Sequence, residues 1–343
     1  MPNDFPDALV AYGWSERVAA LYQSVLTAPS ARPGRVVRVE RGVGVAIGTG
    51  GEETDFHLTI PVAAGDWVVL DGERLTDVLP RRSALQRQDP ETGDAQVLAA
   101  NVDLVLITVP ADRLNANRAE RELALAWESG ALPVVLLTKA DLAPAGLSEE
   151  LATRLVGVHI LPTSTGSDAS VKEVAALFAP DRTGVFLGPS GAGKSSLTNA
   201  LLGYDRQSIG SVREGDRRGR HTTTSRHLLT LPGGGVVIDT PGLRSLGLVS
   251  GDHLGMAFPD IEDLASQCRF ANCMHDREPG CAITEAVAHG TLAAQRLASY
   301  RKLAKEAAAE RVRTDPLAHR GAKRLWGQRA IDSRRYDKRR PSS

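Results

Sequence analysis

Residues 188–196 read Gly-Pro-Ser-Gly-Ala-Gly-Lys-Ser-Ser, and this stretch decides the fold of the central part of the chain. It fits the phosphate-loop pattern of Gly, four residues, Gly-Lys and then Ser or Thr. The apolar residues 184–187 before it predict a short buried strand, and residues 194–202 predict the first turns of a helix. A glycine-rich turn that merely contains Lys-Ser would not need these flanks. The strand, loop and helix together predict a nucleotide-binding α/β domain.

The residue types of this loop suit a phosphate chain. Glycines let the backbone curl so that successive N–H groups point inward, and the helix N-terminus adds partial positive charge. Lys194 is expected to reach the outer phosphates, and the Ser195 hydroxyl is expected to ligate Mg²⁺. The candidate phosphate-binding residues are Gly188, Pro189, Ser190, Gly191, Ala192, Gly193, Lys194, Ser195 and Ser196.

Apolar runs alternate with helical patterns from Ala100 up to this loop. The run 102–109 is continuous, which is typical of a strand buried on both faces of a parallel sheet. Further strands are predicted at 132–137 and 157–161, and helices at 117–129, 148–155 and 170–178. The alternation predicts a doubly wound α/β domain, to which we assign residues 95–248.

A second motif, Thr-Lys-Ala-Asp at 138–141, resembles the guanine-reading motif Asn-Lys-x-Asp. Asp141 would accept hydrogen bonds from the N1–H and amino groups of guanine, while Lys139 would lie along the base and sugar. Adenine lacks this pair of donors, so an ATP-dependent enzyme is disfavoured. A Ser-Thr-Gly loop at 164–166 resembles the companion base-contacting loop. The candidate base-binding residues are Thr138, Lys139, Ala140, Asp141 and Ser164.

Asp239 ends an apolar strand and is followed by Thr-Pro-Gly. Taken alone it would be a turn-forming aspartate, but beside a phosphate loop such a residue holds Mg²⁺, and the Gly242 amide faces the γ-phosphate. An Arg-rich segment at 205–226 contains Gly-Arg-His-Thr-Thr-Thr at 219–224. One of these threonines, for which we take Thr223, should close on Mg²⁺. The predicted magnesium ligands are therefore Ser195, Thr223 and Asp239.

All three cysteines of the chain lie within 14 residues of one another and share that stretch with a histidine. The spacing is C-x₄-C-x-H-x₅-C, and the ligand set is Cys268, Cys273, His275 and Cys281. Three thiolates and one imidazole complete a closed tetrahedral zinc site, so we predict one structural Zn²⁺. The alternative is three free buried cysteines near a surface histidine. Residues 284–312 are rich in Ala with Arg and Lys and predict one long helix, and nearby His289 falls on it, where a solvated role is expected.

Residues 35–90 carry short apolar runs of period two, punctuated by glycines, which predict a small β-barrel. Arg81, Arg82 and Arg87 are expected on an exposed linker after it. The residues alone favour neither of two interpretations. One is an oligonucleotide-binding barrel, and the other is a structural β domain with a solvated basic linker, since few aromatic residues are present for base stacking.

The order of the motifs is unusual, because the base-reading strings precede the phosphate loop. The chain therefore resembles a circularly permuted GTPase, and over nearly its whole length it is similar to the small-ribosomal-subunit biogenesis GTPase family. The strings that carry this resemblance are Asn-Val-Asp at 101–103, 138–141, 188–196, 219–224, 239–242 and the cysteine cluster.

The resemblance implies four parts: an extension at 1–34, an oligonucleotide-binding barrel at 35–90, a permuted GTPase domain at 95–248 and a zinc-binding helical domain with a basic tail at 249–343. It also implies hydrolysis of GTP to GDP, with Mg²⁺, during late maturation of the small (30S) subunit, stimulated by that subunit. Its implied partners are the subunit and its 16S rRNA.

His221 is the candidate catalytic residue. Ras-like enzymes orient the attacking water with a glutamine shortly after Asp-x-x-Gly, but here Leu243 follows Gly242. An imidazole in the Arg-rich segment can hold water near neutral pH, and the family resemblance offers the same residue. The alternative is that His221 contacts only RNA or solvent.

The amino-acid composition limits the possible partners and location of the protein. The 343 residues carry a formal net charge of zero, but residues 320–343 hold nine Lys/Arg and two Asp, together with Trp326 and Tyr336. This tail is either a solvated extension or an rRNA contact. No apolar run spans a membrane and no secretory signal is evident, so we expect a cytoplasmic location. We also expect the protein to be a monomer. The rival hypothesis is a zinc-containing RNA-binding module whose nucleotide site is static.

Overall fold

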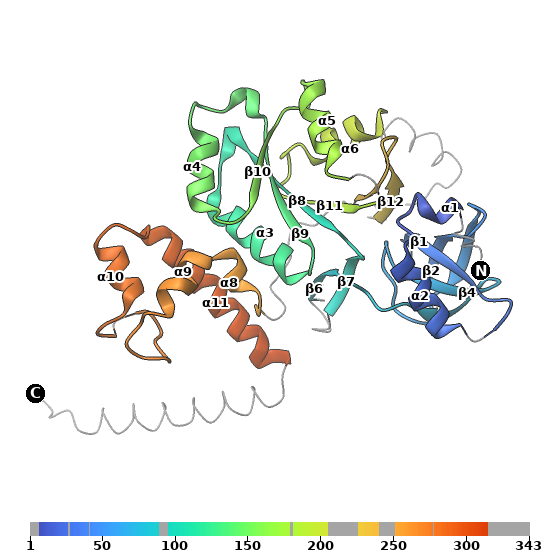
Figure 1. Ribbon diagram of the computed structural model, residues 1–343, viewed down its shortest axis with the longest axis horizontal. Coiled ribbons are helices and arrows are strands. Elements are labelled where there is room, and N and C mark those ends of the chain that lie inside the picture. The colour runs from blue at the N-terminus through green and yellow to red at the C-terminus, as the bar shows by residue number, and fades with distance from the viewer. Residues whose placement is uncertain are drawn as a thin grey trace, which may run out of the picture.

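The computed structural model describes residues 7–26, 28–40, 42–88, 95–178, 181–204, 226–239, 251–276 and 278–314. Its centre is a sheet whose paired strands run in the order β10, β9, β8, β11, β13 and β12 (Figure 1). The bounds are β8 (Leu104–Pro110), β9 (Leu132–Thr138), β10 (His159–Thr163), β11 (Thr183–Leu187), β12 (Arg226–Thr230) and β13 (Val236–Asp239). The neighbours from β10 to β13 pair in parallel, and β12 is antiparallel to β13.

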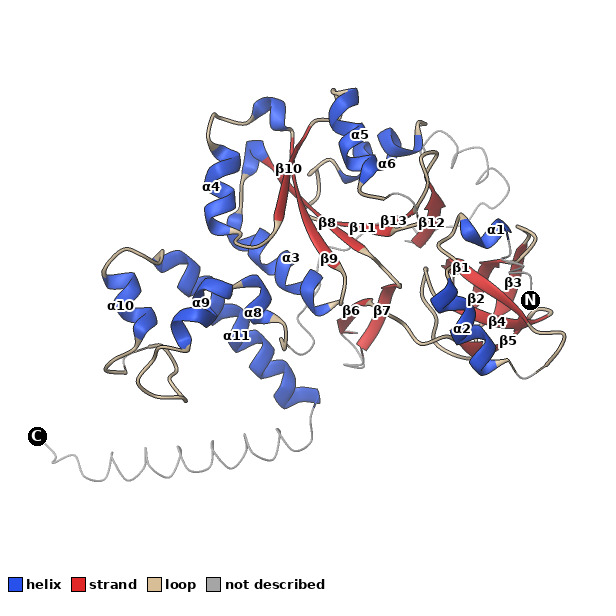
Figure 2. Ribbon diagram, viewed as in Figure 1, coloured by secondary structure: helices blue, strands red, loops and turns tan. Residues whose placement is uncertain are grey.

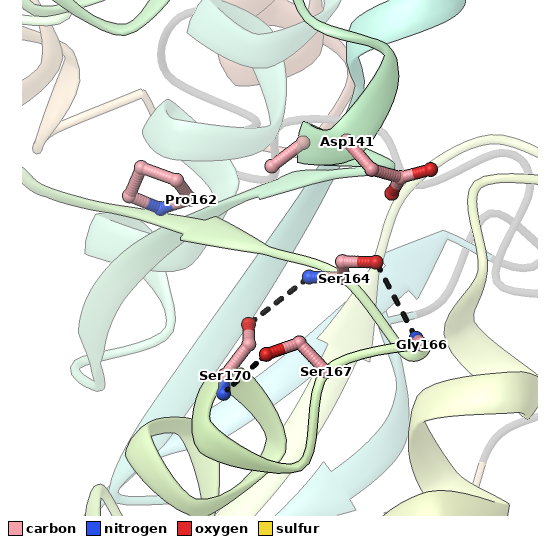
Figure 3. A pocket seen from close by; sticks show the side chains of 7 residues that line it. Asp141, Pro162, Ser164, Gly166, Ser167 and Ser170 are labelled. Atoms are coloured by element: carbon pink, nitrogen blue, oxygen red, sulfur yellow. Dashed lines mark hydrogen bonds between the residues drawn. The ribbon is translucent and has the colours of Figure 1, made fainter.

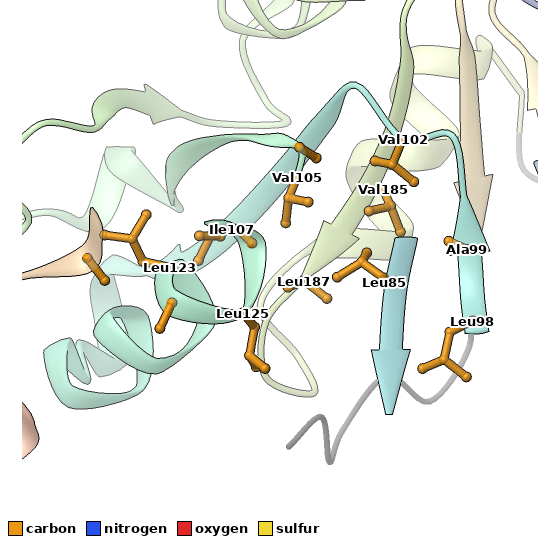
Figure 4. Close-up of a cluster of buried hydrophobic side chains, with 14 of the residues drawn as sticks. Leu85, Leu98, Ala99, Val102, Val105, Ile107, Leu123, Leu125, Val185 and Leu187 are labelled. Carbon is orange, nitrogen blue, oxygen red and sulfur yellow. The ribbon is translucent and has the colours of Figure 1, made fainter. Parts of the chain in front are cut away.

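Helices cover both faces of this sheet (Figure 2). On one face α5 (Asp168–Ala176) and α6 (Lys194–Leu202) pack on Leu104 and Leu106. On the other, α3 (Ala116–Glu128) and α4 (Leu147–Arg154) belong to the same core as Val105 and Ile107 (Figure 4). Because successive strand side chains point to opposite faces, burial on both sides requires the unbroken apolar run seen in the sequence. The predicted doubly wound α/β architecture is confirmed.

Five short antiparallel strands precede this domain: β1 (Arg32–Glu40), β2 (Val43–Ile47), β3 (Glu53–His57), β4 (Trp67–Asp71) and β5 (Arg74–Val78). β1 pairs with both β2 and β4, β2 with β3, and β4 with β5. Their inward side chains form a separate small core that includes Val36, Phe56, Val68 and Leu75. Helices α1 (Asp7–Val10) and α2 (Glu16–Val25) pack beside these strands, and Gly13, at φ +85°, lies between the two helices. An oligonucleotide-binding role for this part stays a prediction.

The expectation of an exposed arginine linker after these strands is wrong for Arg81 and Arg87, which are partly buried, although the Arg82 side chain is 49 % exposed. Residues Ala84–Gln88 (β6) and Ala95–Ala100 (β7) form an antiparallel hairpin, and Leu85 and Leu98 are buried in the main core (Figure 4). Arg81 donates from Nε and Nη2 to the fully buried Asp66 carboxylate, both at 2.7 Å. Burial of the apolar Leu85 and Leu98 side chains holds the hairpin against the core, and the buried Asp66 carboxylate requires a cation.

The strands β1–β5 and the central sheet are continuous, because β1 also pairs antiparallel with β12, Arg38 opposite His227. Arg35 of β1 is 2 % exposed and donates to the Tyr12 carbonyl at 3.1 Å and to the Thr183 hydroxyl at 3.1 Å. Its guanidinium lies 4.5 Å from the ring centre of Trp67. Burial lowers the pKa of Arg35 to about 9, which still leaves it charged at neutral pH.

The C-terminal helices are α8 (Leu254–Ala257), α9 (Pro259–Ala265), α10 (Ala282–Ala288) and α11 (Ala294–Thr314). The sequence predicted one long helix over 284–312, but Gly290, at φ +74°, separates α10 from α11. Helices α8 and α11 contact α3, while α9 packs against α8 and α10 (Figure 1). None of the helices in the described ranges has the length and apolar character needed to cross a bilayer.

Candidate functional site

The phosphate loop follows β11 directly and leads into α6. Gly188, at φ +139°, lies so close to Thr108 that an added Cβ would collide with the Thr108 hydroxyl. Gly191 and Gly193 also have positive φ, at +75° and +88°, and Gly193 precedes the first residue of α6. These positive φ angles strongly favour glycine, so the loop can curl because glycine occupies these three positions.

Lys194 folds back over this loop. Its Nζ donates to the carbonyl oxygens of Gly188 at 2.8 Å and Pro189 at 2.7 Å, while Ser195 and Ser196 are exposed on the first turn of α6. A phosphate entering the loop therefore meets a cation already placed at its rim, and a hydroxyl accessible to a metal ion.

The end of β9 touches the phosphate loop. Thr138 is 3 % exposed, and its hydroxyl donates to the carbonyl of Ala192 at 2.8 Å. Lys139 then adopts a left-handed conformation, φ +56°, which turns the chain into the short 3-10 helix η2 (Ala140–Leu142). The base-reading string is thereby held beside the phosphate loop although the two are over fifty residues apart in sequence.

Asp141 lines a pocket of about 520 Å³ that β10 closes on its other side (Figure 3). Of the residues around it, the sequence motifs indicated Ala140, Asp141 and Ser164, together with Gly166 at the end of the Ser-Thr-Gly loop, but not Pro162, Ser167 or Ser170.

Serine hydroxyls hold the shape of this pocket. The Ser164 amide donates to the Ser170 hydroxyl at 3.0 Å, and the Gly166 amide to the Ser164 hydroxyl at 3.3 Å. Ser167 caps α5 by accepting from the Ser170 amide at 3.4 Å. The signal in the sequence was the serine-rich start of a helix, which predicts a cap but not a pocket wall.

Asp239 ends β13, beside β11 in the sheet. The parallel strands β8, β9, β10, β11 and β13 have their carboxyl ends at one edge, which brings 138–141, 164, 188–195 and Asp239 to the same side. His221, Thr223 and Gly242, like the tail residues Trp326 and Tyr336, lie outside the described residues.

Cys268, Cys273, His275 and Cys281 come together between α9 and α10, with their ligand atoms all within 4.8 Å of one another. The sulfurs of Cys268 and Cys281 are 3.9 Å apart, and each lies 3.6–3.7 Å from Nδ1 of His275. In a tetrahedron with metal–sulfur bonds of about 2.3 Å, two sulfurs are about 3.8 Å apart. The four side chains therefore have the donors and spacing of a closed tetrahedral metal site.

The thiols of this cluster do not ionise alike. Desolvation and the neighbouring thiols raise the pKa of Cys273 to about 11. Burial also disfavours ionised Cys281, but hydrogen bonds from Thr284 and its neighbours outweigh this and lower its pKa to about 6. Close thiols share protons in this way, and a bound cation would favour the thiolate at all three.

Comparison with known proteins places this geometry among related chains. The family model described as RsgA GTPase matches residues 78–249. The Small ribosomal subunit biogenesis GTPase RsgA of Streptomyces coelicolor is 44% identical over 318 residues, covering 87% of this chain and 86% of that protein. The protein of the same name from Opitutus terrae is 41% identical over 359 residues, covering 94% and 97%.

Two solved structures are similar in fold. The crystal structure of YjeQ from Thermotoga maritima superposes with a TM-score of 0.60 at 26% identity, covering 81% of this chain and 98% of that one. YloQ, described as a circularly permuted GTPase, gives 0.58 at 24% identity, covering 81% and 95%. The motif order and the strand order of this chain both agree with a permuted GTPase domain.

Proposed function

Because this chain belongs to the RsgA GTPase family and is a GTP hydrolase by that membership, we propose that it acts on the small ribosomal subunit during late maturation, and that the subunit stimulates hydrolysis. The observation that carries the nucleotide part is the shared edge on which the phosphate loop, Thr138 and the Asp141 pocket meet. The relatives, which are named small ribosomal subunit biogenesis GTPases, support the ribosomal part.

In this proposal GTP lies across the carboxyl edge of the sheet. The phosphate-loop amides and Lys194 bind the phosphates, and Asp141 accepts hydrogen bonds from guanine in the pocket. Ser195, Thr223 and Asp239 hold Mg²⁺, which neutralises charge that develops on the phosphates. The Gly242 amide faces the γ-phosphate.

His221 is the residue that we propose to orient the attacking water, because Leu243 stands where a water-holding glutamine would be expected. The segment that contains His221 is rich in arginine, so an anionic partner such as rRNA would favour its closure on the nucleotide. Hydrolysis is then slow in the free protein and fast on the subunit.

The metal in the cysteine cluster is proposed to be one structural zinc ion. Soft thiolate and imidazole donors in a closed tetrahedron suit Zn²⁺, and no open position is left for chemistry. The barrel, the C-terminal helices and the basic tail are proposed to contact 16S rRNA, with the protein acting as a cytoplasmic monomer.

The test is phosphate release from GTP with and without purified small subunits, for the wild type and for His221→Ala. We expect a subunit-dependent rise in the wild type that the variant loses, while nucleotide and subunit binding stay intact. An unchanged rate on adding subunits, together with tight RNA binding indifferent to nucleotide, would identify a static nucleotide site instead. A variant that keeps the stimulated rate would remove His221 from the mechanism.

A further inference from the structure

We propose that Arg113 is an additional nucleotide-binding residue of this chain, and that its guanidinium binds the phosphate chain of GDP or GTP from outside the phosphate loop. The inference rests on the nucleotide site proposed above. Arg113 belongs to none of the motifs, and only the tertiary structure brings it to the site.

Arg113 reaches the mouth of the phosphate loop from the neighbouring strand. β8 ends at Pro110 and is followed by the 3-10 helix η1 (Ala111–Arg113). From there Nη2 lies 3.4 Å from the carbonyl oxygen of Gly191. A Cβ built on Gly191 would be only 3.0 Å from the same Nη2. Gly191 is exposed, so the guanidinium lies against the open side of the loop.

The charged groups beside Arg113 do not fully neutralise its positive charge. Asp112 pairs with Lys139, whose Nζ lies 2.6 Å from Oδ2, and this hydrogen bond lowers the pKa of Asp112 and keeps it ionised. Nε of Arg113 is 3.9 Å from the same oxygen, at the outer limit of an ion pair. One carboxylate thus faces two cations, and the closer cation is Lys139.

The Arg113 side chain is 62 % exposed, and its two polar contacts with residues that the structure describes are both long. Little of its hydrogen-bonding capacity is used inside the protein, since a guanidinium has five N–H donors. A ligand with negatively charged oxygen atoms could form short hydrogen bonds with most of the N–H donors of this side chain. Phosphate oxygens are such acceptors, and they match the planar fork of arginine.

The position of η1 also fits the course of a bound nucleotide. A nucleoside phosphate that fills the site runs from the loop at 188–194 to the pocket at Asp141. Asp112 is tied to Lys139, the residue two before Asp141, and Arg113 is tied to Gly191. Asp112 and Arg113 therefore lie where the phosphate end and the base end of the site adjoin, and Arg113 is on the phosphate side.

The experiment measures dissociation constants for GDP and for a non-hydrolysable GTP analogue, with the full chain, at several salt concentrations. Arg113→Ala should weaken both by about tenfold, as expected for the loss of a charge-assisted hydrogen bond in a partly exposed setting. Arg113→Lys should recover part of the loss, because it keeps the charge but not the fork. The salt dependence of binding should also be shallower in Arg113→Ala.

Lys172→Ala is the matched control, because it removes one positive charge from an exposed position on α5, the helix whose first turn lines the base pocket. It should bind both nucleotides as the wild type does. An equal loss in this control, or wild-type affinity in Arg113→Ala, overturns the inference. A lower melting temperature of nucleotide-free Arg113→Ala with no recovery in Arg113→Lys also overturns it, since Arg113 would then be structural. A wild type that binds no guanine nucleotide contradicts the proposed function itself.

Discussion

At the scale of single residues, Thr138 shows how one departure from a motif is accommodated. Threonine stands where the guanine-reading motif has asparagine, and its hydroxyl donates to the Ala192 carbonyl in the phosphate loop. The link joins the end of β9 to the phosphate loop after β11, and these two parts must keep a fixed separation to bind one nucleotide. A side chain that can donate to this carbonyl is therefore what the position requires.

We predict that Thr138→Val lowers nucleotide affinity by about fivefold, because a net hydrogen bond contributes about 1 kcal/mol. Valine has nearly the same shape and lacks the donor. Thr138→Ser, which keeps the hydroxyl, is the control and should lie close to the wild type. Titration of a fluorescent GDP analogue measures both, and equal affinities in the valine and serine variants would show that the link is unimportant.

Asp141 carries the predicted choice of base. Asp141→Asn should weaken GTP binding by at least about tenfold, since a carboxylate that accepts two hydrogen bonds is lost. The same variant should bind xanthosine triphosphate better, because the new amide can donate to the C2 carbonyl of that base. Competition binding of the two nucleotides measures the exchange, and an unchanged affinity for GTP would refute the assignment.

At the scale of elements, helix α3 connects the nucleotide domain to the C-terminal helices. Glu120 of α3 is fully buried and accepts from Arg154 of α4 at 2.8 Å and from Arg296 of α11 at 3.2 Å. Arg296 also makes a two-pronged pair with Asp260 of α9, at 2.5 and 2.6 Å. Two carboxylates and two guanidiniums balance, so this network, in which Glu120 and Arg296 are buried and Arg154 and Asp260 are partly exposed, is electrically neutral.

Removing one member of this network should be costly. Glu120→Ala leaves Arg154 without its carboxylate and Arg296 with only one, and we expect a loss of about 3 kcal/mol in unfolding free energy. Glu306→Ala is the control, because it breaks the half-exposed Arg121–Glu306 pair between α3 and α11 and should cost about 1 kcal/mol or less. Urea unfolding followed by tryptophan fluorescence compares them, and similar losses would contradict a special role for the buried network.

The loop between α9 and α10, which carries the cysteine cluster, allows a prediction about metal binding. This loop has Phe270 and Met274 exposed at 42% and 75%, so apolar burial contributes little there and a metal should supply much of the folding free energy. Cys273→Ala should reduce bound zinc from about one ion per chain to none, while GDP binding persists. Elemental analysis and nucleotide titration on the same preparation test this, and a full zinc content in the variant would argue against these ligands.

At the scale of the whole molecule, the strands β1–β5 and the nucleotide domain are joined by strand pairing. β12 is covered on one side by β13 and on the other by β1, whose residues lie almost two hundred positions earlier in the chain. The buried Arg35 reinforces the joint by reaching the start of β11. The two domains are thus parts of one continuous sheet.

A chain that begins after β5 should therefore self-associate. Without β1, the edge of β12 offers unpaired backbone groups to another copy. We expect dimers or larger species that increase with concentration, whereas the full chain remains a monomer under the same conditions. Light scattering coupled to size exclusion measures both, and a truncated chain that stays monomeric throughout would show that β1 is not needed to protect this edge.

The sequence by itself determined which residues of this protein are candidates for nucleotide and metal binding. The phosphate loop, the guanine-reading string and the cysteine cluster are each built from residues close together in the chain, so their spacing alone specifies curled backbone, ligand type and geometry. The continuous apolar run at 102–109 likewise predicts a strand buried on both faces. A short stretch of sequence specifies its own backbone conformation and the ligand atoms that its side chains provide.

Only the tertiary structure decided the rest. The pairing of β1 with β12, the Arg81–Asp66 pair that replaced an expected exposed linker, the pocket walls at Ser167 and Ser170, and the approach of Arg113 to Gly191 all join residues without a shared local pattern. Buried polar groups take whichever partner packing brings within hydrogen-bond distance. That partner depends on how the elements stack, which no single stretch of sequence contains.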